Sequence, residues 1–139
     1  MNGLKWWMRV VGAVYVFGFL ASSVLRLPIR AEGPPGILEH AASGDATARF
    51  VLDTWFTLGV YMGAAGIGLL VASRTPERAR MLVWTVMGME LAGIVADINK
   101  VAHGTYAAPL VWMAVHAAII AVGFFLQSRT HVRGLAASS

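Results

Sequence analysis

The sequence predicts an all-α integral membrane protein, an antiparallel four-helix transmembrane bundle with an outer loop cap between the first two helices. Of its 139 residues, 58% are hydrophobic and only 13% are charged, which is about half the charged fraction of a typical soluble domain. Four apolar runs are long enough to cross about 30 Å of hydrocarbon, since a helix rises about 1.5 Å per residue. Turn and capping residues separate these runs. We therefore expect a single integral membrane domain that covers residues 1–139.

The ends of the apolar runs carry recognisable helix-start signals. Asp45 is a candidate N-cap for the second helix, and Thr75 is one for the third, with Pro76 at its first position. Pro109 can open the fourth helix in the same way. The predicted helices cover approximately residues 6–27, 46–73, 76–100 and 109–127.

The connection after the first helix, "RLPIRAEGPPGILEHAASGD", is too long for a simple antiparallel turn. Within it, "GILEHAASG" can form about two turns of helix that end at Gly44, because glycine readily adopts the left-handed conformation after a helix. We expect this segment to cover the outer end of the bundle. A solvated loop without a further role is the alternative interpretation.

Basic residues predict the orientation in the membrane, because positive charge is retained on the cytoplasmic side. They cluster before the first predicted helix, between the second and third, and after the fourth: Lys5 and Arg9, then "RTPERAR", then Arg129 and Arg133. Both termini are therefore expected in the cytoplasm. Three arginines around the first loop oppose this orientation: Arg26, Arg30 and Arg49.

Composition also argues against several classes of function. The chain has no cysteine, which excludes disulfides, thiolate metal sites and thiol catalysis. Its net charge of +4 arises from residues at the ends of apolar runs, so we expect the lipid bilayer as a partner and no nucleic acid. The spacing of histidines and carboxylates does not match a metal-binding helix pair, and no metal or other cofactor is expected.

Two carboxylates lie inside the third apolar run, in "MGMELAGIVADINK". Glu90 lies close to mid-span, and Asp97 follows on the same helix face, nearly two turns nearer the outer surface. Lys100 is one turn beyond Asp97 and can pair with it. Glu90 has no donor among its own helical neighbours, so a partner must come from another helix.

Depth along the predicted spans selects the residues that can accompany Glu90. They form a candidate polar seam on the bundle interior: Tyr15, Asp53, Thr57, Tyr61, Glu90, Asp97, Lys100 and His116. Ionisable groups inside a membrane usually face the bundle interior or a wet cavity. The seam is interpreted either as the lining of an outward-opening binding pocket or as a hydrogen-bond network that only holds the helices in register.

Small residues mark a second feature, a helix-packing face. Gly59 and Gly63 in "GVYMG" form a Gly-x-x-x-Gly pattern, and Gly66 follows. Such a face lets another helix approach closely. We expect packing within the chain rather than a dimer interface.

The whole chain resembles the BphX-like family of small bacterial four-span membrane proteins, which were first noted beside biphenyl-degradation genes. The resemblance lies in "LKWWMRVVGAVYVFGF", "LPIRAEGPPG", "ARFVLDTWFTLG", "WTVMGMELAGIVADI" and "VWMAVHAAIIAVG". It implies a bacterial inner-membrane location and a context of apolar aromatic compounds. The family has no established activity or catalytic residues, so the resemblance assigns no role to any residue.

Three functional hypotheses remain open on the sequence. The first is a membrane protein that binds an apolar or amphipathic small molecule in an intramembrane pocket and is linked to aromatic-compound metabolism. The second is an accessory or structural subunit of a larger membrane complex, and the partner is then that complex or, as a further possibility, other copies of this chain in a homo-oligomer. The third is a small intramembrane isomerase or hydrolase that uses Glu90 as acid or base.

Overall fold

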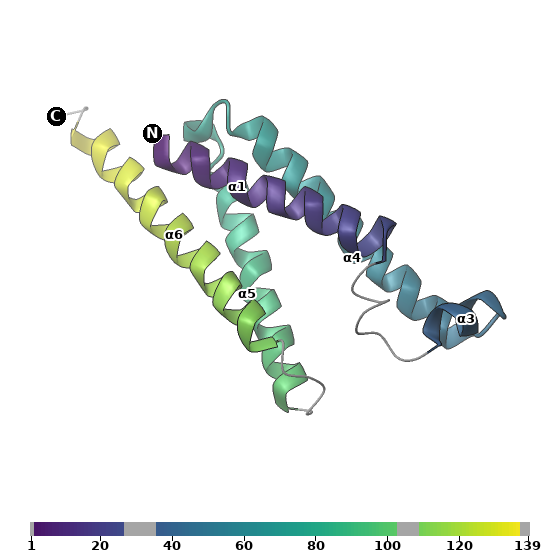
Figure 1. Ribbon diagram of the computed structural model, residues 1–139. Coiled ribbons are helices and arrows are strands. Elements are labelled where there is room, and N and C mark those ends of the chain that lie inside the picture. The colour runs from purple at the N-terminus through teal and green to yellow at the C-terminus, as the bar shows by residue number, and fades with distance from the viewer. Residues whose placement is uncertain (1, 27–35, 103–108, 137–139) are drawn as a thin grey trace. The chain divides into compact units, whose positions relative to one another are not determined.

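The computed structural model describes residues 2–26, 36–102 and 109–136, and every regular element in these ranges is helical (Figure 1). The elements in chain order are α1 (Asn2–Phe19), the π-helix η1 (Leu20–Val24), α3 (Ile37–Ala42), α4 (Ala46–Ala72), the 3-10 helix η2 (Pro76–Arg78), α5 (Arg80–Ala102) and α6 (Pro109–Ala136). Four helical segments are long and apolar enough to cross a membrane: Gly3–Val24, Ala46–Ala72, Arg80–Ala102 and Leu110–Arg129. The predicted all-α, four-span class is confirmed.

Contacts divide the chain into two compact units. One consists of Met1–Val11 with Leu69–Ser139, and the other of Gly12–Gly68. The single integral membrane domain that the sequence predicts stays a prediction.

In the Gly12–Gly68 unit, the glycines of α4 face the second half of α1. A Cβ atom on Gly66 would lie 2.7 Å from the carbonyl oxygen of Gly12, and one on Gly59 would lie 1.6 Å from Ser23 Oγ. Neither position has room for a larger side chain. The small-residue face of α4 is therefore used for close helix packing within the chain, as predicted.

The same unit contains the short helix predicted in the first loop. α3 ends at Ala42, and Gly44 follows it with φ 101°, a conformation that glycine adopts without strain. Ile37 and Ala41 pack with Ala48 at the start of α4 in a small apolar cluster. Asp45 Oδ1 accepts a hydrogen bond of 2.8 Å from the Ala48 backbone N–H, which confirms Asp45 as the N-cap of α4.

The start of the third span differs from its prediction. Pro76 begins a 3-10 turn in which the Arg78 N–H donates to the Thr75 carbonyl, and α5 begins only at Arg80. The Thr75 side chain makes no capping hydrogen bond, so its assignment as a cap of the long helix is wrong. The 3-10 turn satisfies part of the backbone and leaves the hydroxyl without that role.

Helix ends also differ at the first and last spans. α1 gives way to the π-helix η1, in which the Leu25 N–H donates to the Leu20 carbonyl at 2.9 Å, and helix α6 continues to Ala136. The predicted ends, residues 27 and 127, were placed where the apolar runs fade. Hydropathy marks the part of a helix that lipid can surround, whereas backbone hydrogen bonding sets where the helix stops.

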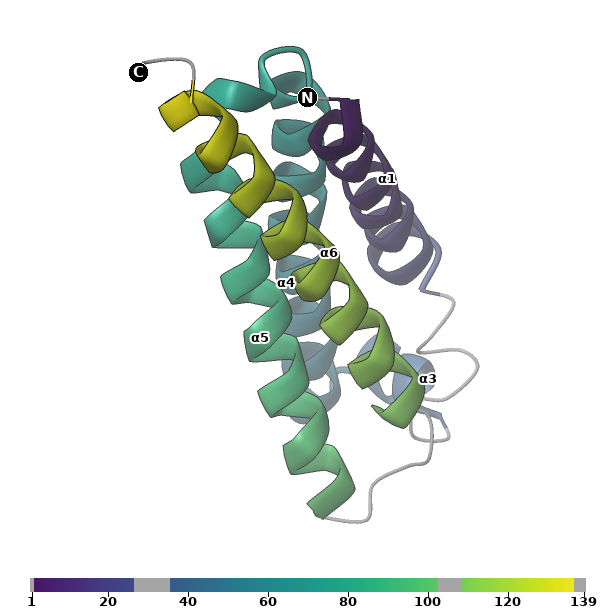
Figure 2. The ribbon, with the colours of Figure 1, turned by 90° about the vertical axis from the view of Figure 1, so that its left-hand side faces the viewer.

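In the other unit, α5 and α6 lie side by side and antiparallel, as both views show (Figures 1 and 2). The start of α5 lies near the end of α6, where the Trp84 and Phe124 rings meet edge to face at 6.2 Å between centroids. The first turns of α1 join them through Trp7, whose indole N–H donates to the Ile119 carbonyl at 3.2 Å. The side chains of Met8, Val83 and Val86 are fully buried.

Candidate functional site

The most buried ionisable group in the α5–α6 pair is the carboxylate of Glu90, near the middle of the α5 span. Glu90 is only 3% exposed, and its Oε2 atom is in direct hydrogen-bonding contact with Nδ1 of His116 on α6. A carboxylate in this position needs a donor because lipid provides none. His116 supplies a hydrogen-bonding partner from the neighbouring helix.

A glycine on α5 makes room for the His116 ring. Gly93 lies one turn after Glu90, and a Cβ atom built on it would lie 2.8 Å from Cε1 and 2.9 Å from Nε2 of His116. Real Cβ atoms almost never approach that closely. Gly93 is thus a positioning residue that sequence reasoning missed. Its signal was a small residue one turn from an intramembrane carboxylate, on the same helix face.

Asp97 and Lys100 lie further along the same helix. Asp97 is 4% exposed, and its Oδ1 accepts a hydrogen bond of 2.8 Å from Lys100 Nζ. The Lys100 side chain is 49% exposed, so it reaches inward from the span end to a buried carboxylate. The predicted pairing of these two residues is present.

The second oxygen of Asp97 has a different environment. Asp97 Oδ2 is buried and has no hydrogen-bond partner in the described part of the chain. Nε2 of His116 lies 3.7 Å from this oxygen, which is beyond hydrogen-bonding distance. The His116 ring therefore lies between two buried carboxylates, in contact with one and separated from the other.

We name Glu90, Asp97, Lys100 and His116 the polar quartet. The quartet combines two carboxylates with one ammonium group and one imidazole, and grouping acidic with basic side chains limits the cost of placing them within a membrane. The arrangement holds an imidazole against a carboxylate, and Asp97 Oδ2 is a buried acceptor without a partner among the described residues. These two features are the ones that can take part in ligand binding or catalysis.

The other four residues of the predicted seam belong to the Gly12–Gly68 unit. Tyr15 is 3% exposed, whereas Tyr61 is 66% exposed, and Asp53 and Thr57 also have exposed side chains. Within the α5–α6 pair, the structure brings together Glu90, Asp97, Lys100 and His116. That all eight residues form one seam stays a prediction.

A metal centre was not expected from the sequence. Among the described residues, no group of three or more histidine, aspartate or glutamate side chains is arranged to hold a metal ion.

Comparison with known proteins gives one result. The family model described as BphX-like matches residues 1–132 of this chain, which is nearly its whole length. Comparisons with curated proteins and with solved structures gave no match.

Proposed function

Because this chain belongs to the BphX-like family and has four helices able to cross a membrane, we propose that it binds a small amphipathic molecule inside the membrane. The polar quartet anchors the polar end of that molecule. The proposal includes the aromatic-compound context that the family resemblance implies.

One observation carries the proposal: Asp97 Oδ2 is buried without a hydrogen-bond partner in the described part of the chain. Leaving a buried acceptor unsatisfied costs about 1–3 kcal/mol, and more when the group is charged. A ligand hydroxyl or amine would remove that cost by donating to Asp97 Oδ2. The chemistry therefore favours an apolar molecule with a hydrogen-bond donor at one end.

We propose that a ligand reaches this acceptor past two partly exposed neighbours. The His116 side chain is 23% exposed and that of Lys100 is 49% exposed, so the buried oxygen lies just behind groups that solvent or lipid reaches. In the proposed orientation, with both termini cytoplasmic in a bacterial inner membrane, the Lys100 end of the quartet faces outward.

The test uses a pair of probes that differ only in the hydrogen-bond donor. Thermal unfolding of the full detergent-solubilised chain is measured with 4-hydroxybiphenyl and with biphenyl. We expect 4-hydroxybiphenyl to raise Tm progressively as its concentration increases and biphenyl to have a much smaller effect. Equal Tm shifts with both probes would show that binding does not depend on a hydrogen bond from the ligand to Asp97 Oδ2.

Two matched variants test whether 4-hydroxybiphenyl binds at the polar quartet. Asp97→Asn is expected to weaken 4-hydroxybiphenyl binding about tenfold, because a neutral acceptor replaces a charged one. Asp53→Asn, which changes an exposed carboxylate on α4, is expected to leave the affinity unchanged. Similar losses in both variants would refute the assignment of the site.

The contact between Glu90 and His116 favours a second candidate, an intramembrane isomerase or hydrolase. A carboxylate touching an imidazole is a common arrangement for general acid–base catalysis. Incubation with an ester or an isomerisable analogue of the bound probe tests this. An enzyme predicts turnover that Glu90→Gln abolishes while binding persists, and binding without turnover rejects this candidate.

A further inference from the structure

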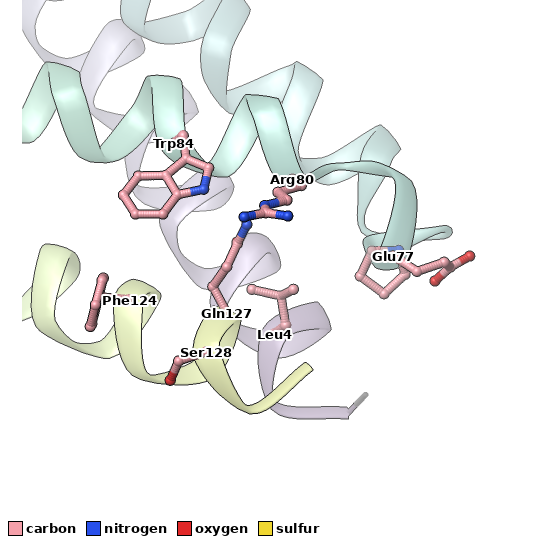
Figure 3. A pocket seen from close by; sticks show the side chains of 8 residues that line it. Leu4, Glu77, Arg80, Trp84, Phe124, Gln127 and Ser128 are labelled. Carbon is pink, nitrogen blue, oxygen red and sulfur yellow. The ribbon is translucent and has the colours of Figure 1, made fainter. Parts of the chain in front are cut away.

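The geometry points to a second, separate binding site, in which Arg80 holds the phosphate of an anionic lipid at the opposite end of the α5–α6 pair from Lys100. The site is a cavity of about 310 Å³, a size at the lower end for small-molecule sites. Its lining comes from α1, η2, α5 and α6: Leu4, Pro76, Glu77, Arg80, Trp84, Phe124, Gln127 and Ser128 (Figure 3). No residue of the polar quartet is among them.

The lining has an apolar side and a polar side. The apolar side consists of Leu4, Trp84 and Phe124. The Trp84 and Phe124 rings pack edge to face, with an interplanar angle of 78°. The side chains of Arg80 and Gln127 point toward one another across the middle of the pocket (Figure 3). A ligand that satisfies both sides must itself be amphipathic.

The depth of the cavity places it at the membrane surface. Arg80 is the first residue of one membrane span, and Ser128 lies near the end of another, Leu110–Arg129. Arginine and tryptophan are typical of this level, where headgroups meet acyl chains. A membrane lipid is the amphipathic molecule present there at high concentration.

The positive charge around the cavity favours a lipid with an anionic headgroup. In the described part of the chain, no salt bridge to Arg80 is formed, so its guanidinium is available for a bidentate contact with phosphate. Glu77 is the single acidic residue of the lining and has an exposed side chain. The same span ends in this unit also carry further cations: Lys5, Arg9, Arg74, Arg78 and Arg129. Basic sites between spans bind anionic headgroups for this reason.

The first experiment measures lipid-dependent Tm shifts of the full detergent-solubilised chain. The probes are phosphatidylglycerol, phosphatidylcholine and inorganic phosphate. We expect phosphatidylglycerol to stabilise the chain at concentrations at least tenfold lower than either of the other probes. Equal effects of phosphatidylcholine would overturn the charge selection, and equal effects of inorganic phosphate would overturn the role of the acyl chain.

Two arginine variants separate the site from general attraction to negative charge. Arg80→Gln is expected to weaken phosphatidylglycerol binding about tenfold, whereas Arg78→Gln, an exposed neighbour outside the lining, changes it less than about twofold. Glu77→Gln is expected to leave binding unchanged or to tighten it. Equal losses in the two arginine variants, or a loss in Glu77→Gln, would overturn the proposal.

A measurement on the unaltered chain keeps the proposal testable if Arg80→Gln does not fold. Brominated acyl chains quench nearby tryptophan fluorescence, and Trp84 lines the cavity. Brominated phosphatidylglycerol is expected to quench more than brominated phosphatidylcholine at the same mole fraction, and Trp84→Phe should remove the excess. The absence of any excess in the unaltered chain would overturn the site.

Discussion

Gly93→Ala is the substitution that tests the polar quartet most directly. The added Cβ atom would lie 2.8 Å from Cε1 and 2.9 Å from Nε2 of the His116 ring, so the ring or α6 must shift. Overpacking of this kind typically costs about 1–3 kcal/mol. Displacing the ring would also weaken its contact with Glu90.

Gly88→Ala on the same helix is the matched control. A Cβ atom on Gly88 would meet nothing within 4 Å. Both substitutions gain the same helix propensity, about 1 kcal/mol for alanine over glycine, so this gain cancels when the two variants are compared. The difference between them is therefore the cost of crowding His116, about 1–3 kcal/mol.

Reversible unfolding in mixed micelles by a denaturing detergent gives the free energy of each variant. A double-mutant cycle with His116→Ala then isolates the pair, because Gly93→Ala should cost little once the ring is absent. If Gly93→Ala and Gly88→Ala are equally stable, the His116 ring does not occupy the space beside Gly93, and the geometry of the quartet is refuted.

Three further substitutions have defined expectations, each read as a free energy of unfolding in the same assay. Glu90→Gln is expected to cost about 1–3 kcal/mol because it weakens the hydrogen bond that a buried side chain makes to His116, whereas Glu77→Gln at an exposed position should change stability by less than about 0.5 kcal/mol; equal effects would contradict the burial of Glu90. Gly66→Ala, whose Cβ would lie 2.7 Å from a carbonyl oxygen of α1, is expected to cost about 1–3 kcal/mol, with Gly18→Ala, where the nearest atom is at 3.8 Å, as its tolerated counterpart. Asp45→Ala removes the cap of α4 and should cost about 1 kcal/mol; no loss would mean that water replaces the cap.

Local signals in the sequence predicted the fold where one residue decides the backbone conformation. Asp45 and Gly44 did so at the α3–α4 junction, because a cap and a left-handed glycine each act on a few neighbouring backbone groups. The start of the third span was missed because Thr75 and Pro76 suit a 3-10 turn as well as an α-helix. The residues near Thr75 and Pro76 carry no signal that favours the 3-10 turn over the α-helix.

The site was predictable only in part, for a reason specific to membrane helices. Counting depth brought Glu90 and His116 to similar levels, and the structure has them in contact. Rotation about the helix axis is harder to read, because a helix surrounded by lipid is apolar on every side and its periodicity is weak. The exposed position of Tyr61 and the cavity beside Arg80 depend on such rotations and on the packing of helix ends.

The contact between α5 and α6 has a consequence for how the chain enters the bilayer. On its own, α5 would bring the Glu90 carboxylate into hydrocarbon near mid-span, and a centrally placed acidic residue disfavours insertion by about 2.5–3.5 kcal/mol. Pairing with His116 supplies the compensating group only when α6 is already alongside. The last two spans are therefore expected to leave the translocon together as a helical hairpin, so that truncation after α5 would leave that span poorly inserted.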